Sequence, residues 1–179
     1  MPEKLKNCEP SLHLNIVDQI LQIPKQILSY HHENGLVDLV LHNISKNNCL
    51  SFSKAAYLVD NPDFNQLKGI CGFNSSNSFE TQMQNQQNFI EQILKSAYNC
   101  KVKSINRESF RAKNIDLSNQ ANIIELCDSL EIKNPKTLSW DLKHNNYGVL
   151  IFETEQPDCC SWKNSLVEQV SHLLGMCAF

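Results

Sequence analysis

The sequence has no apolar run that approaches the roughly 20 residues a helix needs to cross a bilayer. Its first residues, Met-Pro-Glu-Lys-Leu-Lys-Asn, also lack the apolar core of a signal peptide. Both absences predict a cytoplasmic protein with no membrane partner. Residues 1–10 form a polar N-terminal segment, and no linker divides residues 11–179, so we expect a single domain over that range.

The chain also lacks a large excess of positive or negative charge. The chain has 16 Lys and Arg residues against 19 Asp and Glu residues, which gives a formal net charge of −3. The basic residues are scattered along the chain and form no stripe that could follow a phosphate backbone. Nucleic-acid binding is therefore not expected as the main role.

Familiar catalytic motifs are missing as well. The chain carries no Gly-rich phosphate loop, no nucleophile elbow and no metalloprotease motif. Its eight cysteines include no C-x-x-C pair, and in a reducing compartment we expect mostly free thiols, several of them small core residues. His31, His32 and Glu33 lie together, but consecutive histidines on a helix point about 100° apart. A solvated helix end explains them better than a metal site does.

Helical periodicity marks both ends of the chain. Apolar residues at steps of three and four predict a helix over residues 16–30, in which Pro24 should produce a kink or a split. Gly35 should end that region, and a second helix should follow over residues 36–44. The closing helix is predicted over residues 162–177 by the stripe Trp162, Leu166, Val170, Leu173 and Cys177.

Two pairs of strands are predicted between these helices. Residues 52–59 and 67–73 should form a hairpin, in which Gly69 and Gly72 either bend the second strand or permit a close approach to its backbone. Residues 137–142 and 147–153 should form the second pair. The stretch Val149 to Phe152 is apolar at every position, which predicts a central strand buried on both faces.

The middle of the chain is less regular. Residues 74–92 are mostly polar, yet Phe79, Met83, Ile90, Ile93 and Ala97 keep helical spacing, which predicts a loop that leads into an amphipathic helix. Residues 101–116 fit neither the helical nor the strand period. A further helix is predicted over residues 121–130, capped by Asp116 or Ser118.

The order of these elements resembles the GAF family. The segments Leu36-Val37-Asp38-Leu39-Val40-Leu41, Phe52 to Asp60 and Leu67-Lys68-Gly69-Ile70-Cys71-Gly72-Phe73 resemble the opening of a GAF domain. The segments Leu138 to Leu142, Tyr147 to Glu153 and Trp162 to Cys177 resemble its late strands and terminal helix. The resemblance covers residues 36–73 and 137–177 and implies an α+β fold. In that fold a central antiparallel sheet has the N- and C-terminal helices on one face and the middle helices on the other, a GAF/PAS-like arrangement.

The resemblance also implies a function: a non-catalytic signalling or regulatory domain that forms a homodimer through its terminal helices. It implies a small ligand, such as a cyclic nucleotide, a tetrapyrrole or a metabolite, held under the middle helices, and it specifies no particular cofactor. The residues expected to line that site are Tyr57, Phe73, Phe110, Cys127 and Trp140. For any single one of them, ordinary core packing is the commoner explanation.

Two alternatives remain open at this stage. One GAF-like group reduces methionine sulfoxide through cysteines, and Cys159 and Cys160 precede the closing helix, where amide dipoles would favour a thiolate. The sequence lacks the cysteine pattern of that group, however, so a cysteine-dependent redox enzyme is the second hypothesis. A structural dimerisation module without a ligand is the third.

Overall fold

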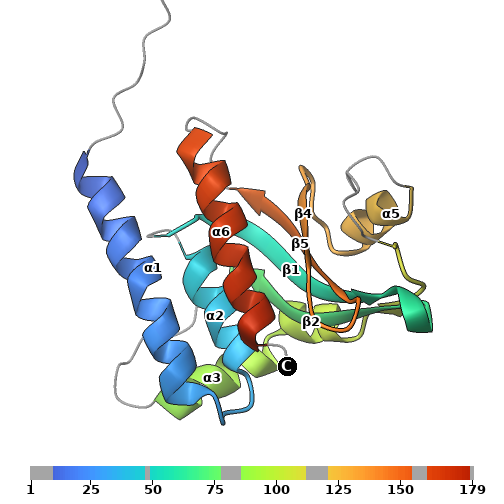
Figure 1. The fold of residues 1–179 in the computed structure, drawn as a ribbon, viewed down its shortest axis with the longest axis horizontal. Helices are drawn as coiled ribbons and strands as arrows, with labels where there is room; N and C mark the ends of the chain where they lie inside the picture. Colours follow the sequence, from blue (N-terminus) through green and yellow to red (C-terminus); the bar gives the residue numbers. More distant parts are fainter. Residues whose placement is uncertain (1–9, 47–48, 78–85, 112–120, 155–160, 178–179) are drawn as a thin grey trace, which may run out of the picture.

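The computed structural model describes residues 10–46, 49–77, 86–111, 121–154 and 161–177. Two helices open the chain and one long helix closes it, with two strand pairs and three shorter helices between them (Figure 1). The helices are α1 (Pro10–Tyr30), α2 (Leu36–Ser45), α3 (Gln86–Lys95), α4 (Ala97–Lys103), α5 (Ala121–Ser129) and α6 (Ser161–Cys177), with a short 3-10 turn over Pro62–Phe64. The strands are β1 (Phe52–Asn61), β2 (Gln66–Asn74), β3 (Asn106–Arg107), β4 (Lys136–Asp141) and β5 (Tyr147–Thr154).

One antiparallel sheet contains all five strands, in the order β3-β2-β1-β5-β4. The predicted α+β class, the early hairpin and the late strand pair are therefore confirmed. β5 lies between β1 and β4, and its residues from Tyr147 to Phe152 are buried, as an apolar strand covered on both faces requires. The early and late halves of the chain thus share one sheet.

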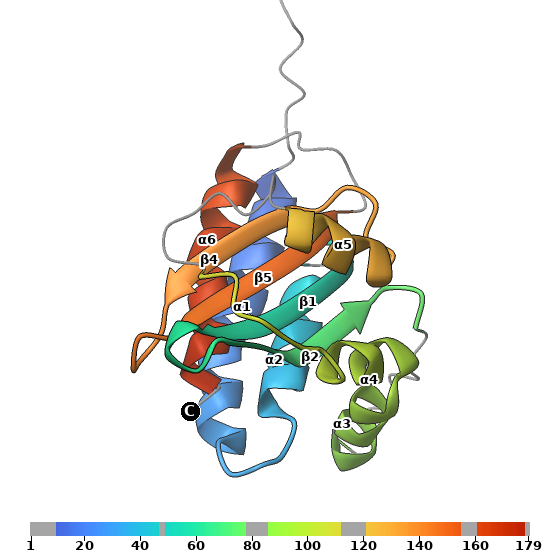
Figure 2. The ribbon, with the colours of Figure 1, turned by 90° about the vertical axis from the view of Figure 1, so that its right-hand side faces the viewer.

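Alternation along β1 divides the core into two layers. Tyr57 and its neighbour Ala55 belong to a cluster with Ile23 of α1, Val40 of α2 and Leu174 of α6. The alternate residues Ala56 and Leu58 face a second cluster with side chains of α4 and α5. Figure 2 shows α4 and α5 in front of the sheet and α1, α2 and α6 behind it.

Helix α1 is continuous through Pro24, so the predicted split does not occur. Proline removes an N–H group that would bond to the carbonyl of Ile20, but Pro24 lies on the exposed side of the helix. Water can reach that carbonyl, which removes the main reason for a break. Gly35 has a φ of +94° between α1 and α2, a conformation that favours glycine, and so the turn predicted there is confirmed.

The irregular middle contains two helices where the sequence predicted one. Ser96 interrupts the helical spacing between Ile93 and Ala97, and its side chain accepts a hydrogen bond from the Asn99 N–H as the N-cap of α4. Helix α4 then packs closely on β2, because Gly69 and Gly72 leave room for Val102. Phe79, Met83, Asp116 and Ser118 lie outside the described residues.

Candidate functional site

The structure divides the five predicted site residues between the two faces of the sheet. Tyr57, Phe73 and Trp140 lie in the cluster with α1, α2 and α6, whereas Phe110 and Cys127 lie in the cluster with α4 and α5. This differs from the expectation that all five face the middle helices. The reason is strand register, since only alternate residues of β1 and β2 reach either face.

Phe110 and Cys127 are ordinary core residues in this structure. Phe110 is buried, and its backbone N–H donates to Oδ1 of Asp60 at 3.2 Å. Cys127 is also buried, and burial raises the pKa of its thiol to about 11. Both contribute apolar surface to the cluster beneath α5, which accounts for their position without a ligand.

Tyr57 and Trp140 form an aromatic pair on the other face. Their rings are stacked, with 5.6 Å between centroids and 7° between planes. Trp140 pairs with Gly148 of β5, and a Cβ atom at Gly148 would stand 2.6 Å from Cζ2 of the indole. The missing side chain at Gly148 therefore lets the indole lie flat across the sheet.

A hollow of about 550 Å³ opens to solvent beside this pair. It lies between the end of β4 with the turn that follows and the C-terminal half of α6. Its volume falls within the range of small-molecule sites. The hollow is lined by Trp140, Asp141, Leu142, Lys143, His172, Gly175 and Met176.

Trp140, which lines the hollow, has a hydrogen-bond donor without a partner among the described residues. Nε1 of Trp140 is buried, and so is the equally unpaired hydroxyl of Tyr57. Gly175 of α6 covers the indole so closely that a Cβ atom there would lie 3.1 Å from Nε1. A buried N–H group without an acceptor costs about 1–3 kcal/mol, which a ligand acceptor could recover.

His172 and Lys143 bring basic groups to the rim. The His172 ring meets Trp140 edge-on, with 5.9 Å between centroids. Sequence reasoning identified Trp140 but missed the other lining residues, because nothing in the sequence shows which turn of α6 faces β4. A glycine inside the closing helix, three residues after a histidine, was the one available signal.

Three further thiols, those of Cys49, Cys71 and Cys177, do not have the character of nucleophiles. Burial raises the pKa of Cys49 and of Cys177 to about 11, and it raises that of the fully enclosed Cys71 well above its usual range. These thiols stay protonated near neutral pH, whereas the thiolate is the reactive form. Cys159 and Cys160 lie outside the described residues.

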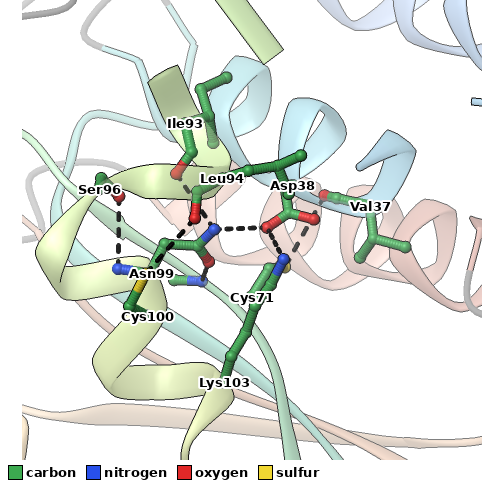
Figure 3. A network of polar contacts seen from close by, with 10 residues as sticks. Val37, Asp38, Cys71, Ile93, Leu94, Ser96, Asn99, Cys100 and Lys103 are labelled. Atoms are coloured by element: carbon green, nitrogen blue, oxygen red, sulfur yellow. Dashed lines mark hydrogen bonds and ion pairs between the residues drawn. The ribbon is translucent and has the colours of Figure 1, made fainter. Parts of the chain in front are cut away.

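A second group of polar side chains joins α2, β2 and α4 (Figure 3). Oδ1 of Asp38 accepts a hydrogen bond from Nδ2 of Asn99 at 2.6 Å and lies 2.8 Å from Nζ of Lys103. Oδ1 of Asn99 in turn accepts from the Gly72 N–H at 2.8 Å. Because Asp38 and Asn99 are buried and bonded to one another, this cluster fastens helices to the sheet edge and offers no open site.

Asp38→Ala should therefore destabilise the fold by about 2 kcal/mol, because it leaves the buried Asn99 amide and the half-exposed Lys103 amine without their shared acceptor. Asp38→Asn is the matched control, since it keeps one side-chain oxygen in place and should cost less. Urea denaturation of the three proteins measures the difference. Equal stability of Asp38→Ala and the wild type would show that the cluster does not fasten α4.

The structure gives three further findings, on metal ligands, on His31 and on membrane-spanning helices. Within the described ranges, no three His, Cys, Asp or Glu side chains gather as a metal ion would require. Nδ1 of His31 lies 2.9 Å from the carbonyl oxygen of Leu28, as expected for a histidine at a helix C-terminus. Among the described helices, none is both long and apolar enough to cross a bilayer.

No protein-family model, curated protein or solved structure matches the chain. The geometry of the hollow is therefore the feature that bears on function.

Proposed function

We propose that the protein is a non-catalytic regulatory domain that binds a small molecule in the hollow beside Trp140 and forms a homodimer through its terminal helices. One observation carries the proposal: a hollow of about 550 Å³ between β4 and α6 is lined by Trp140, whose buried Nε1 has no hydrogen-bond partner among the described residues. Small-molecule sites combine such apolar walls with a few fixed polar groups.

The lining favours a ligand with a flat apolar body and at least one hydrogen-bond acceptor. Trp140, Leu142 and Met176 offer apolar surface, and Met176 is 68% exposed although it is a large hydrophobic residue. Lys143 and His172 supply donors at the rim. A ligand acceptor that reaches Nε1 of the indole must displace Gly175 of α6, which covers it, and would then satisfy a donor that has no partner among the described residues.

The position of the hollow suits a regulatory role. One wall belongs to the sheet and the other to α6, so a ligand would contact both at once. Helix α6 packs against α1 and α2, which connects the hollow to the rest of the helical layer. A ligand that fits one position of α6 better than another would shift the balance between them.

The arrangement of elements supports the GAF-like part of the proposal. The segments that carry the resemblance, residues 36–73 and 137–177, form α2, the hairpin β1–β2, the strands β4 and β5, and α6. Helices α2 and α6 lie on one face of their common sheet, and α1 packs against both of them on the outside. The proposed ligand site differs from the one that the resemblance implies, since it lies on the face of the terminal helices.

Trp140→Phe tests this site, because phenylalanine keeps an aromatic ring and removes the N–H group. In thermal-shift titrations against a panel of small aromatic acids and metabolites, we expect at least one ligand to raise the melting temperature of the wild type. Its dissociation constant should rise about tenfold in Trp140→Phe, the value of one hydrogen bond. Ile124→Ala, on the exposed side of α5, is the control and should bind as the wild type does. Unchanged affinity in Trp140→Phe would contradict the role assigned to Nε1.

A further inference from the structure

Helix α1 carries two apolar stripes, and only one of them packs inside the protein. Ile16, Ile23 and Ile27 are buried, and the last two belong to the core cluster with α2 and α6. The second stripe faces outward: Val17, Leu21 and Leu28 are 48%, 59% and 76% exposed, and the exposed Pro24 lies between the last two. Figure 1 shows α1 at the outside of the helical layer, with α2 and α6 between it and the sheet.

The outward stripe has the spacing of a helix–helix seam. Val17, Leu21, Pro24 and Leu28 follow one another at steps of four, three and four, the alternation of a and d positions in a heptad. A surface helix that packs on one side only normally shows charged or polar residues on its opposite side. Large apolar side chains at this spacing therefore indicate a second helix as the partner.

Two opposite charges lie beside the stripe. Asp18 follows Val17, and Lys25 follows Pro24, so both occupy the same edge of the seam, seven residues apart. Both side chains are exposed, and neither forms an ion pair with any residue that the structure describes. Seven residues span about 10 Å along a helix, so Asp18 and Lys25 of one chain do not meet each other.

We infer that α1 is the seam of a homodimer in which the two copies of α1 run antiparallel. A twofold axis between residues 22 and 23 places Val17 against Leu28 of the second copy and Leu21 against Pro24 of the second copy. The same register brings Asp18 within about 3 Å, along the axis, of Lys25 of the second copy. Symmetry repeats each contact, as an isologous interface requires.

The antiparallel orientation follows from the edges of the seam. In an antiparallel pair, residues on the same edge of the two helices face each other, so Asp18 meets Lys25. In a parallel pair, Asp18 and Lys25 would instead face the opposite edge of the partner helix, where Ile20 and Ile27 lie. Those isoleucines pack toward the protein core and offer no charge. Only the antiparallel pair therefore forms two complementary ion pairs.

The inference rests on the homodimer of the proposed function and gives that homodimer a surface and an orientation.

Four apolar side chains per copy make a small interface, so we expect a dissociation constant in the micromolar range. Sedimentation velocity of the full chain across that range measures it. Leu21→Glu should raise the dissociation constant at least about thirtyfold, since it places a charge within the seam. Ile124→Glu is the matched control and should leave the constant unchanged.

Charge reversal tests the orientation. Asp18→Lys and Lys25→Asp should each weaken the dimer about five- to thirtyfold, because each replaces two attractions with two repulsions. The double variant should restore the wild-type constant. If Leu21→Glu leaves the dissociation constant unchanged, the inference is overturned and the homodimer must form through another surface. If the single reversals weaken the dimer and the double variant does not restore the wild-type constant, the antiparallel register is overturned. A chain that stays monomeric would overturn both the seam and the homodimer, while ligand binding is tested separately by Trp140→Phe.

Discussion

Gly69→Ala should destabilise the protein by more than about 3 kcal/mol, the largest effect we expect from a single methyl group in this chain. A Cβ atom at this position would overlap the carbonyl oxygen of Val102, a backbone atom of α4 that has no rotamer to escape into. The Gly69 N–H also donates to the carbonyl of Ile105 at 3.0 Å. Alanine must therefore push α4 and the segment after it away from β2.

Lys68→Ala is the control for this prediction. It places the same residue on the same strand, one position earlier, where the side chain is exposed. Urea denaturation should show a change of no more than about 0.5 kcal/mol for Lys68→Ala. If Gly69→Ala were as stable as Lys68→Ala, the close packing of α4 on β2 would be wrong.

Acidification should destabilise the protein through His42. This residue is 6% exposed, and its ring lies edge-on to both Phe73 and Phe89. Burial, followed by the nearby charge of Lys46, lowers the pKa of His42 from 6.5 to about 3. Between the unfolded pKa of 6.5 and the folded pKa of about 3, His42 is protonated in the unfolded chain and neutral in the folded protein. The free energy of unfolding therefore falls as the pH falls below 6.5.

The size of this effect follows from the shift in pKa. At pH 4.5, two units below the unfolded pKa, the loss attributable to His42 is about 3 kcal/mol. His42→Phe removes the titrating group and keeps an aromatic ring among aromatic neighbours. We expect urea denaturation at pH 7 and pH 4.5 to show a smaller loss for His42→Phe than for the wild type by about this amount. Equal losses in the two proteins would assign the acid sensitivity to other groups.

The sheet could be predicted from the sequence because its signals are local. The turn at Asp60 to Asp63 and the apolar run from Val149 to Phe152 mark their strands without reference to the rest of the chain. The middle of the chain was harder. Ser96 ends one helix and caps the next within a continuous apolar spacing, and β3 is only two residues long.

The site was only partly predictable, because it depends on register and on the rotation of α6. Tyr57 and Trp140 were predicted as site residues, and the structure brings them together. Their position beneath α6 follows from the pairing of Trp140 with Gly148, which no local pattern reveals. His172 and Gly175 join the site only once α6 is docked on β4.

Native mass spectrometry of Gly175→Leu against the wild type tests most directly whether the hollow binds a small molecule. Leucine suits a helix, and at this position its side chain would extend toward Leu142 and the indole N–H and fill the hollow. After incubation with a metabolite extract, the wild type should carry an added small-molecule mass that Gly175→Leu, folded by circular dichroism, does not carry. No added mass on the wild type, or the same mass on both proteins, would contradict a ligand site between β4 and α6.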